Sequence, residues 1–142
     1  MSNDASLLRY RLRVLEAIAA LTAARLALLV LPFAWIAGAA GRVDGGDAHD
    51  RPRRATTDPV SVDVRGALRA GVRRLPGRTT CLARAIAGRM MLARRGRPST
   101  LVLGVASSRE TVSAHAWLMT ADGYVCGGRA ARRFRPLAAI RS

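Results

Sequence analysis

The chain of 142 residues contains no lysine and few aromatic residues, and both shortages bear on its partners. All 24 basic residues are arginine, against nine acidic residues, and the formal net charge is +15. A charge of this size favours a polyanion or an acidic peptide as partner. Nucleic-acid binding also relies on aromatic stacking, to which two residues each of Trp, Tyr and Phe contribute little. Because the arginines are scattered rather than clustered, we predict that nucleic acid is not a partner.

Cysteine is also scarce, since only Cys81 and Cys126 are present. Two cysteines do not make the disulfide framework of a secreted domain. Residues 2–13 are too polar and too mixed in charge to open as a signal peptide. A zinc site needs closely paired ligands, which this spacing does not provide. We therefore predict a cytoplasmic protein with reduced thiols, no metal and no cofactor.

A long hydrophobic run is missing as well. Residues 26–40 carry no charge, but a transmembrane helix needs about 20 apolar residues. Pro32 also interrupts the run, because proline inside a helix removes a hydrogen bond and kinks or ends the helix. Two interpretations stay open for residues 26–40: helices packed on the domain or on a protein partner, and contact with a membrane surface.

Three regions differ in composition. We predict a hydrophobic helical segment over 1–41, a polar linker over 42–59 and a compact α+β core over 60–142. His49 lies in the linker and receives no role. Within the core, apolar spacing predicts helices over 60–75 and 81–95 and strands over 100–106 and 113–120. Asp122-Gly123 predicts a hairpin turn, after which a return strand begins at Tyr124.

Cys81 is the first candidate for chemistry. It follows Thr79 and Thr80, which are good N-cap residues, and therefore stands at the predicted start of a helix. The helix macrodipole and the free N–H groups of a first turn favour a thiolate there, which is the nucleophile that amide cleavage needs. The competing interpretation is a buried structural cysteine. Cys126 has no such environment and is predicted to be a small packed hydrophobic residue.

His115 is the second candidate, within the strand segment Ala-His-Ala-Trp that ends at Trp117. Alternation places His115, Trp117 and Met119 on one face of that strand. We expect the strand to be the central one of three and the imidazole to face the start of the helix. There it would form a base–nucleophile pair with Cys81; the alternative is a satisfied core histidine. The Cys81 N–H would contribute to an oxyanion hole, with Thr79 or Thr80 as the second donor.

Four segments together resemble one family, and they are fairly specific in this order and spacing. They are Cys81-Leu-Ala-Arg84-Ala-Ile-Ala, Leu92-Ala-Arg-Arg-Gly96, Leu103-Gly-Val105 and Ala114-His-Ala-Trp117. The chain resembles the transglutaminase-like leader peptidases of lasso peptide biosynthesis over about its second half. The resemblance implies a papain- or transglutaminase-like core, in which the cysteine helix packs on a small antiparallel sheet after an N-terminal helical segment.

The same resemblance implies an activity and partners. It identifies Cys81 as nucleophile and His115 as base of a cytoplasmic cysteine peptidase, which hydrolyses the leader from a ribosomally synthesised precursor peptide. The implied partners are the precursor leader and a separate leader-binding protein, with the lasso cyclase as a further candidate. Two alternatives remain: an acyltransferase of transglutaminase type, and a catalytically weakened basic protein that binds peptides or membranes.

The chain departs from the family at one position. The family carries an acidic residue on the return strand, which orients the histidine, and its place here falls near Gly127 or Gly128. Asp122 cannot replace it, because seven residues of extended strand span about 23 Å. Three possibilities follow: the Cys–His pair works alone, a backbone carbonyl holds the imidazole, or an acid such as Glu110 or Asp63 arrives from elsewhere.

Overall fold

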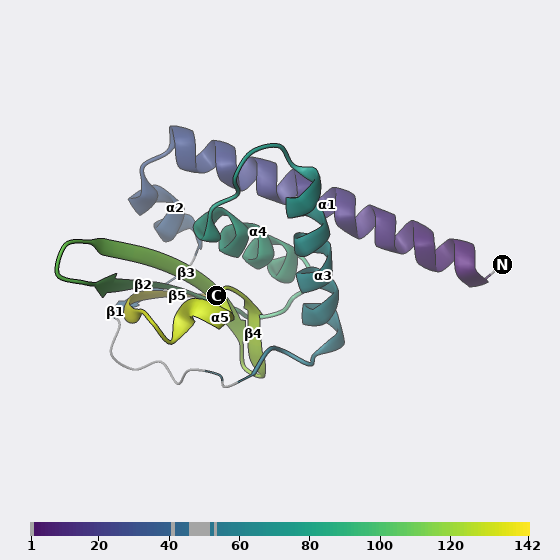
Figure 1. Ribbon diagram of the computed structural model, residues 1–142. Helices are drawn as coiled ribbons and strands as arrows, with labels where there is room; N and C mark the ends of the chain where they lie inside the picture. The colour runs from purple at the N-terminus through teal and green to yellow at the C-terminus, as the bar shows by residue number, and fades with distance from the viewer. Residues whose placement is uncertain (1, 41, 46–51, 53) are drawn as a thin grey trace.

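The computed structural model describes residues 2–40, 42–45, 52 and 54–142, so the predicted loop residue His49 lies outside the described residues. Helices cover one face of an antiparallel sheet, and a short helix lies against the other face (Figure 1). The predicted α+β class is confirmed.

The N-terminal segment forms α1 (Ser2–Val30) and α2 (Phe33–Ala40), which separate at Pro32 as predicted. The second half of α1 packs on α3 and α4, whereas its first half extends beyond the domain (Figure 1). The packed face recurs at helical spacing and comprises Val14, Ala17, Leu21 and Ala24. Within the described residues, neither helix combines the length and the apolar character that crossing a membrane requires.

Two further helices have well-defined starts. Asp58 caps α3 (Pro59–Arg74) by accepting a 3.0 Å hydrogen bond from the N–H of Ser61. Thr80 caps α4 (Cys81–Ala93) in the same way, through a 3.1 Å bond from the N–H of Ala83. Both are expected cap chemistries, since a side-chain oxygen satisfies a first-turn N–H that lacks an intrahelical acceptor. The predicted start of the helix at Cys81 is therefore correct.

The sheet contains more strands than predicted. Its order is β1 (Arg42–Gly45), β5 (Arg135–Arg141), β2 (Thr100–Ser107), β3 (Val112–Thr120) and β4 (Gly123–Cys126), all antiparallel. The strand of His115 is β3, which lies second from the edge rather than at the centre. Between β4 and β5 the chain forms the short helix α5 (Gly128–Ala131).

The predicted linker over 42–59 is partly built into the domain. Residues 42–45 form β1, and Ala55 makes an isolated bridge with Tyr124 of β4. The strand was not predicted because it pairs with β5 through backbone groups, which any sequence supplies.

Two cores lie on the two faces of the sheet. The helix-side core joins α1, α3 and α4 to one face, and its large members include Leu21, Leu68, Met91, Leu92, Leu101 and Leu118. The far-face core lies under α5 and comprises Val102, Trp117, Tyr124, Ala131 and Ala139, with Met119 and Phe134 packed against it.

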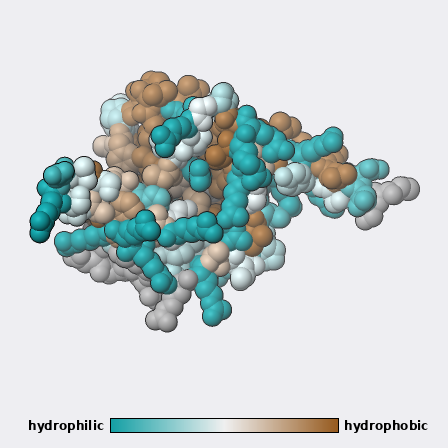
Figure 2. All heavy atoms as spheres, viewed as in Figure 1, coloured by the Kyte–Doolittle hydropathy of each residue, from teal (hydrophilic) through white to brown (hydrophobic). Residues whose placement is uncertain are grey.

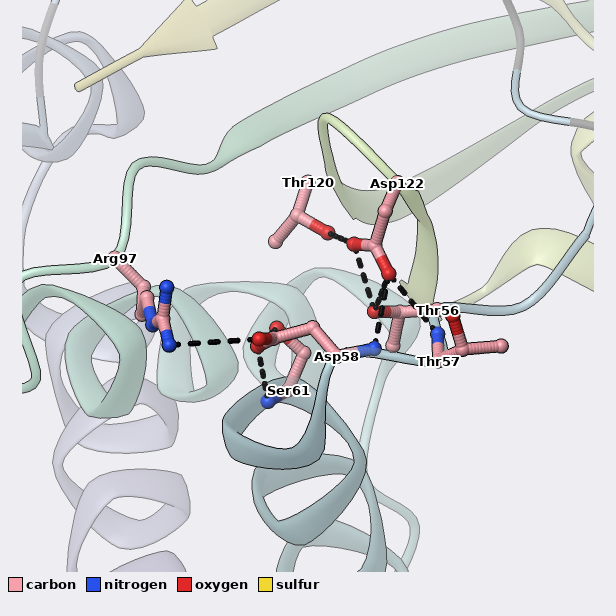
Figure 3. A network of polar contacts seen from close by, with 7 residues as sticks. All are labelled: Thr56, Thr57, Asp58, Ser61, Arg97, Thr120 and Asp122. Carbon is pink, nitrogen blue, oxygen red and sulfur yellow. Dashed lines mark hydrogen bonds and ion pairs between the residues drawn. The ribbon is translucent and has the colours of Figure 1, made fainter.

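Asp122 ties the β3–β4 hairpin to the start of α3 (Figure 3). Its carboxylate accepts hydrogen bonds of 2.6 Å from the Thr120 hydroxyl and 2.9 Å from the Thr56 hydroxyl. The backbone N–H groups of Thr57 and Asp58 also donate to it, at 3.0 and 2.9 Å. The predicted turn residue is thus also an anchor, which holds β4 in place relative to the helices.

Candidate active site

Cys81 is the first residue of α4 and has a free thiol. It is half-buried and packs against the helix-side core. Since Thr80 takes the N–H of Ala83, the N–H groups of Cys81 and Leu82 remain without an intrahelical acceptor. Those donors lie in the same first turn as Cys81, at the positive end of the helix dipole, where an anion is stabilised.

The two threonines before Cys81 have different environments. The Thr80 hydroxyl oxygen is engaged as the cap of α4. The Thr79 hydroxyl oxygen is buried, and within the described part of the chain it has no hydrogen-bond partner. An enclosed hydroxyl without an acceptor is costly unless a ligand supplies one. Of the two predicted candidates for the second oxyanion donor, Thr79 is therefore the one whose hydroxyl is free.

His115 is held by a backbone carbonyl. Its Nε2 atom lies 2.9 Å from the carbonyl oxygen of Gly127. A carbonyl oxygen can only accept a hydrogen bond, so in the neutral ring the proton belongs on Nε2 and Nδ1 is left as the basic nitrogen. This contact corresponds to one of the three possibilities drawn from the sequence.

Glycine is required at the two positions where an acid was expected. Gly127 has a φ of 76°, and a Cβ atom there would lie 2.6 Å from the carbonyl oxygen of Ala116 and 2.9 Å from the Cα of Trp117. A Cβ atom at Gly128 would overlap the ring of Tyr124. The backbone therefore approaches β3 too closely to carry any side chain, and its carbonyl occupies the place of the acid.

The other acidic candidates lie elsewhere. Asp63 makes an ion pair of 2.5 Å with Arg13 of α1. Glu110 lies exposed in the turn between β2 and β3. Asp122 is engaged in the network of Figure 3. Within the described residues, no carboxylate forms a hydrogen bond or an ion pair with His115.

The side chain of His115 leaves β3 on the far face, not on the helical side. Its ring centroid lies 6.1 Å from that of Trp117, which is 1% exposed, and 5.0 Å from that of Phe134. Cys81 approaches from the helix-side core. No hydrogen bond joins the thiol to the imidazole in the described part of the structure, so their pairing stays a prediction.

Cys126 is related to both candidates. It packs against the same core as Cys81, and it directly precedes Gly127, whose carbonyl holds His115. Burial raises the pKa of the Cys126 thiol to about 12; the charge of Arg84 opposes this rise and that of Cys81 adds to it. The Cys126 thiol is thus uncharged at neutral pH, as its predicted role as a packed residue requires.

A cleft of about 620 Å³ extends around the end of β4. It is bounded by α3 and α4 on the helical side and by His115 and α5 on the far side. Cys126 and Gly127 line it, whereas Cys81 does not. A larger cleft of about 820 Å³ contains Thr120 and Asp122 but neither candidate residue. No cluster of three or more His, Cys, Asp or Glu side chains suited to a metal occurs among the described residues.

The sequence left open whether a backbone carbonyl holds His115 and did not identify which one, although consecutive glycines after a short strand are a signal for unusual backbone geometry. The arginines that line the cleft were not predicted at all, because they lie far apart in the sequence.

Comparison with known proteins supports this arrangement. The sequence model of the transglutaminase-like superfamily matches residues 10–139, a span that runs from α1 into β5. No curated protein and no solved structure matches the chain. The superfamily includes cysteine peptidases and acyltransferases. With its cysteine helix packed on an antiparallel sheet behind an N-terminal helix, the chain belongs to the transglutaminase-like superfamily.

Proposed function

We propose that the chain is a cysteine peptidase that hydrolyses the leader from a ribosomally synthesised precursor of lasso type in the cytoplasm. Cys81 is the nucleophile and His115 the base. One observation carries the proposal: the Gly127 carbonyl fixes the proton of His115 on Nε2 and frees Nδ1 as a base. The position of Cys81 at the first residue of α4 supplies the second half of a thiol hydrolase site.

The proposed reaction has two steps. The Cys81 thiolate attacks the carbonyl carbon of the scissile bond, and the protonated imidazole of His115 gives its proton to the leaving amine of the core peptide. A thioester now links the leader to Cys81. Nδ1 of His115 then takes a proton from water as the water oxygen attacks the thioester, and the C–S bond breaks. The leader leaves as a carboxylate, its proton passes to the freed amine, and the thiolate and the protonated imidazole are restored.

The oxyanion of both steps needs fixed donors. The N–H of Cys81 is one, since it has no intrahelical acceptor. The Thr79 hydroxyl is the second, because its buried oxygen has no partner among the described residues. Both groups lie at the N-terminus of α4. The same capped helix start therefore holds the nucleophile and its two donors.

The end of β4 is where the two side chains are proposed to meet. β4 stops at Cys126, opposite Leu118, and beyond this point none of the described strands pairs with that edge of β3. His115 lies on the far face of the sheet and the start of α4 on the helical face. At an unpaired strand edge, groups on the two faces can approach each other. Two observations support this proposal: Cys81 and Cys126 pack against the same core, and the carbonyl of the next residue, Gly127, lies beside His115.

An acyltransferase is the alternative that keeps the chemistry and changes the acceptor. The superfamily includes such enzymes, and the same thioester can pass its acyl group to an amine instead of water. Adding a primary amine to the reaction distinguishes the two activities: a peptidase yields the free leader carboxylate, and an acyltransferase yields the leader amide.

A partner surface is proposed on the N-terminal helices. Hydrophobic residues gather over the C-terminal end of α1 and over α2 (Figure 2). Leu29 is 82% exposed, Val30 75% and Trp35 69%. Large exposed apolar patches mark interaction sites, and we propose the leader-binding protein as the partner here, with the membrane surface as the alternative. Leu29→Ser with Trp35→Ser should abolish co-purification with the leader-binding protein; loss of vesicle binding alone would identify the membrane instead.

The direct test combines the purified chain, the leader-binding protein and a precursor peptide. Mass spectrometry should detect free leader and core from the wild-type chain and neither product from Cys81→Ala. If Cys81→Ala cleaves as fast as the wild type, the proposed nucleophile is wrong.

A further inference from the structure

The cleft beside His115 is strongly basic. Its lining includes six arginines and, among the described residues that line it, no carboxylate. The arginines come from the segment before α3, from α3, from α4 and from α5 and its C-terminal end, and they are Arg54, Arg65, Arg69, Arg84, Arg129 and Arg132. Folding thus gathers charges that lie up to 78 positions apart in the sequence, from Arg54 to Arg132.

These charges are not neutralised within the described part of the chain. The described ion pairs all use arginines outside the cleft: Arg13–Asp63, Arg94–Glu16, Arg95–Glu16 and Arg97–Asp58. Arg65 donates to the backbone carbonyl of Thr56, at 3.3 Å, and not to a carboxylate of the described residues. Like charges gathered without counter-charges repel one another, and they raise the local concentration of anions.

Arg84 gives the strongest indication of a ligand. Its Nε atom is buried, and no hydrogen-bond acceptor reaches it among the described residues. The guanidinium group lies close enough to Cys126 to lower the pKa of that thiol against the effect of burial. A buried donor on a charged group is costly to leave unpaired. Because Arg84 lines the cleft, an oxygen atom of a ligand bound there would satisfy this donor.

We propose that this cleft binds an acidic segment of the peptide substrate beside the scissile bond. The inference rests on the proposed peptidase function and adds the chemical class of its substrate. Carboxylates suit arginine, whose planar fork can donate two parallel hydrogen bonds to one carboxylate. A volume of about 620 Å³ accommodates a few side chains.

A nucleic acid fits the same cleft less well. Single-stranded nucleic acid is bound by stacking of bases on aromatic rings as well as by charge. The lining contains one aromatic residue besides His115, namely Tyr124, which is 8% exposed and packed in the far-face core. The ring of His115 faces Trp117 and Phe134. The charge is therefore matched to carboxylates rather than to stacked bases.

The test is a binding measurement on the full-length Cys81→Ala chain, which cannot turn over the peptide. Fluorescence anisotropy is recorded with a labelled peptide that carries Asp and Glu residues, and with the same peptide in which Asn and Gln replace them. We expect the acidic peptide to bind at least about tenfold more tightly, and its binding to weaken with added salt.

Two arginines of α3 give a matched pair of variants. Arg69 lines the cleft, whereas Arg73, one helical turn further along α3, does not, and both are exposed. Arg69→Glu should weaken the acidic peptide about fivefold or more, and Arg73→Glu, which changes the net charge equally, by less than about twofold. Equal effects of the two variants, or equal affinity for both peptides, would overturn the proposal.

Further controls separate this inference from the proposed function. An oligonucleotide of the same charge should compete poorly, and tighter binding of that oligonucleotide would identify a nucleic-acid site instead. Cleavage is scored separately with the wild-type chain. Selective binding without cleavage would support the acidic-peptide site and refute the peptidase. Cleavage without a preference for the acidic peptide would support the peptidase and refute the acidic-peptide site.

Discussion

The Nε2 atom of His115 and the carbonyl oxygen of Gly127 lie 2.9 Å apart, in the place where an acidic side chain was expected. A carbonyl group selects the same tautomer as a carboxylate, because both accept a hydrogen bond. It carries no full charge, however, and stabilises an imidazolium ion less. In the proposed site the carbonyl would therefore orient the histidine as an acid does, with a smaller electrostatic contribution.

The tautomer of His115 is a direct consequence. In the neutral ring we predict the proton on Nε2 and a free Nδ1. The chain has two histidines, so His49→Ala leaves one imidazole to observe. ¹⁵N NMR at alkaline pH should then show one protonated ring nitrogen, which is Nε2, and one unprotonated ring nitrogen, which is Nδ1. Rapid averaging of the two tautomers would show that the Gly127 carbonyl does not hold the ring.

A side chain at position 127 should be harmful. Gly127→Ala forces a left-handed backbone on an L-residue and brings Cβ against the Ala116 carbonyl, which should cost about 1–3 kcal/mol of unfolding free energy. Gly127→Asp should cost at least as much and should not raise activity. Gly66→Ala in α3 is the control, since nothing lies within 4 Å of the added Cβ, and it should stabilise the helix by about 0.5–1 kcal/mol. Chemical denaturation measures all three variants; greater activity in Gly127→Asp would contradict the structure.

The two thiols should differ sharply in reactivity. Burial raises the pKa of Cys126 to about 12, so at neutral pH it should resist iodoacetamide. Cys81 is half-buried at the start of α4 and should be alkylated. Peptide mapping by mass spectrometry gives the modified site. Preferential modification of Cys126 in the folded chain would show that the reactive thiol was assigned to the wrong residue.

The threonines before Cys81 should separate catalysis from stability. Thr79→Val removes a buried hydroxyl that has no partner among the described residues, so stability should hold or rise. If that hydroxyl stabilises the oxyanion, kcat should fall about 100-fold with KM unchanged. Thr80→Ala instead removes the cap of α4 and should cost about 1 kcal/mol of stability. A Thr79→Val enzyme with normal kcat would exclude this oxyanion donor.

The anchor at Asp122 should make stability depend on pH. The hydrogen bond from Thr120, followed by those from Thr56 and the backbone of Asp58 and Thr57, lowers the pKa of Asp122 below its ordinary 3.8. The unfolded chain therefore binds the proton more readily, so this contribution is complete above pH 3.8 and declines as the pH falls below it. Asp122→Asn should flatten that decline and cost about 1 kcal/mol at neutral pH. An unchanged acid-unfolding curve would contradict the anchoring role.

Local signals predicted the elements that carry the candidate residues. The threonine caps and apolar spacing located α4, and alternation located β3 and the face of His115. β5 was missed because Pro136 and the two alanines Ala138 and Ala139 give it a weak strand signal. Its place between β1 and β2 also depends on long-range pairing. The prediction that the His115 side chain faces the start of α4 was also wrong. Alternation shows which residues of β3 share a face, but it does not show which face the helices cover.

The basic cleft could not be predicted from the sequence either, because it depends on long-range packing. Arg69 and Arg84 are 15 positions apart and belong to different helices, so only the packing of α3 and α4 around the end of β4 brings them together. A scattered arginine excess in the sequence thus becomes a concentrated charge in the fold.

Activation of Cys81 by His115 has its most direct test in the rate of thiol alkylation. That rate is measured as a function of pH for the wild-type chain and for His115→Ala, with Cys126→Ser in both so that one thiol reports. If the two side chains form a thiolate–imidazolium pair, His115→Ala should slow alkylation near neutral pH by about tenfold or more, and the difference should vanish at high pH. Identical pH–rate curves for the two proteins would show that the imidazole does not act on the sulfur.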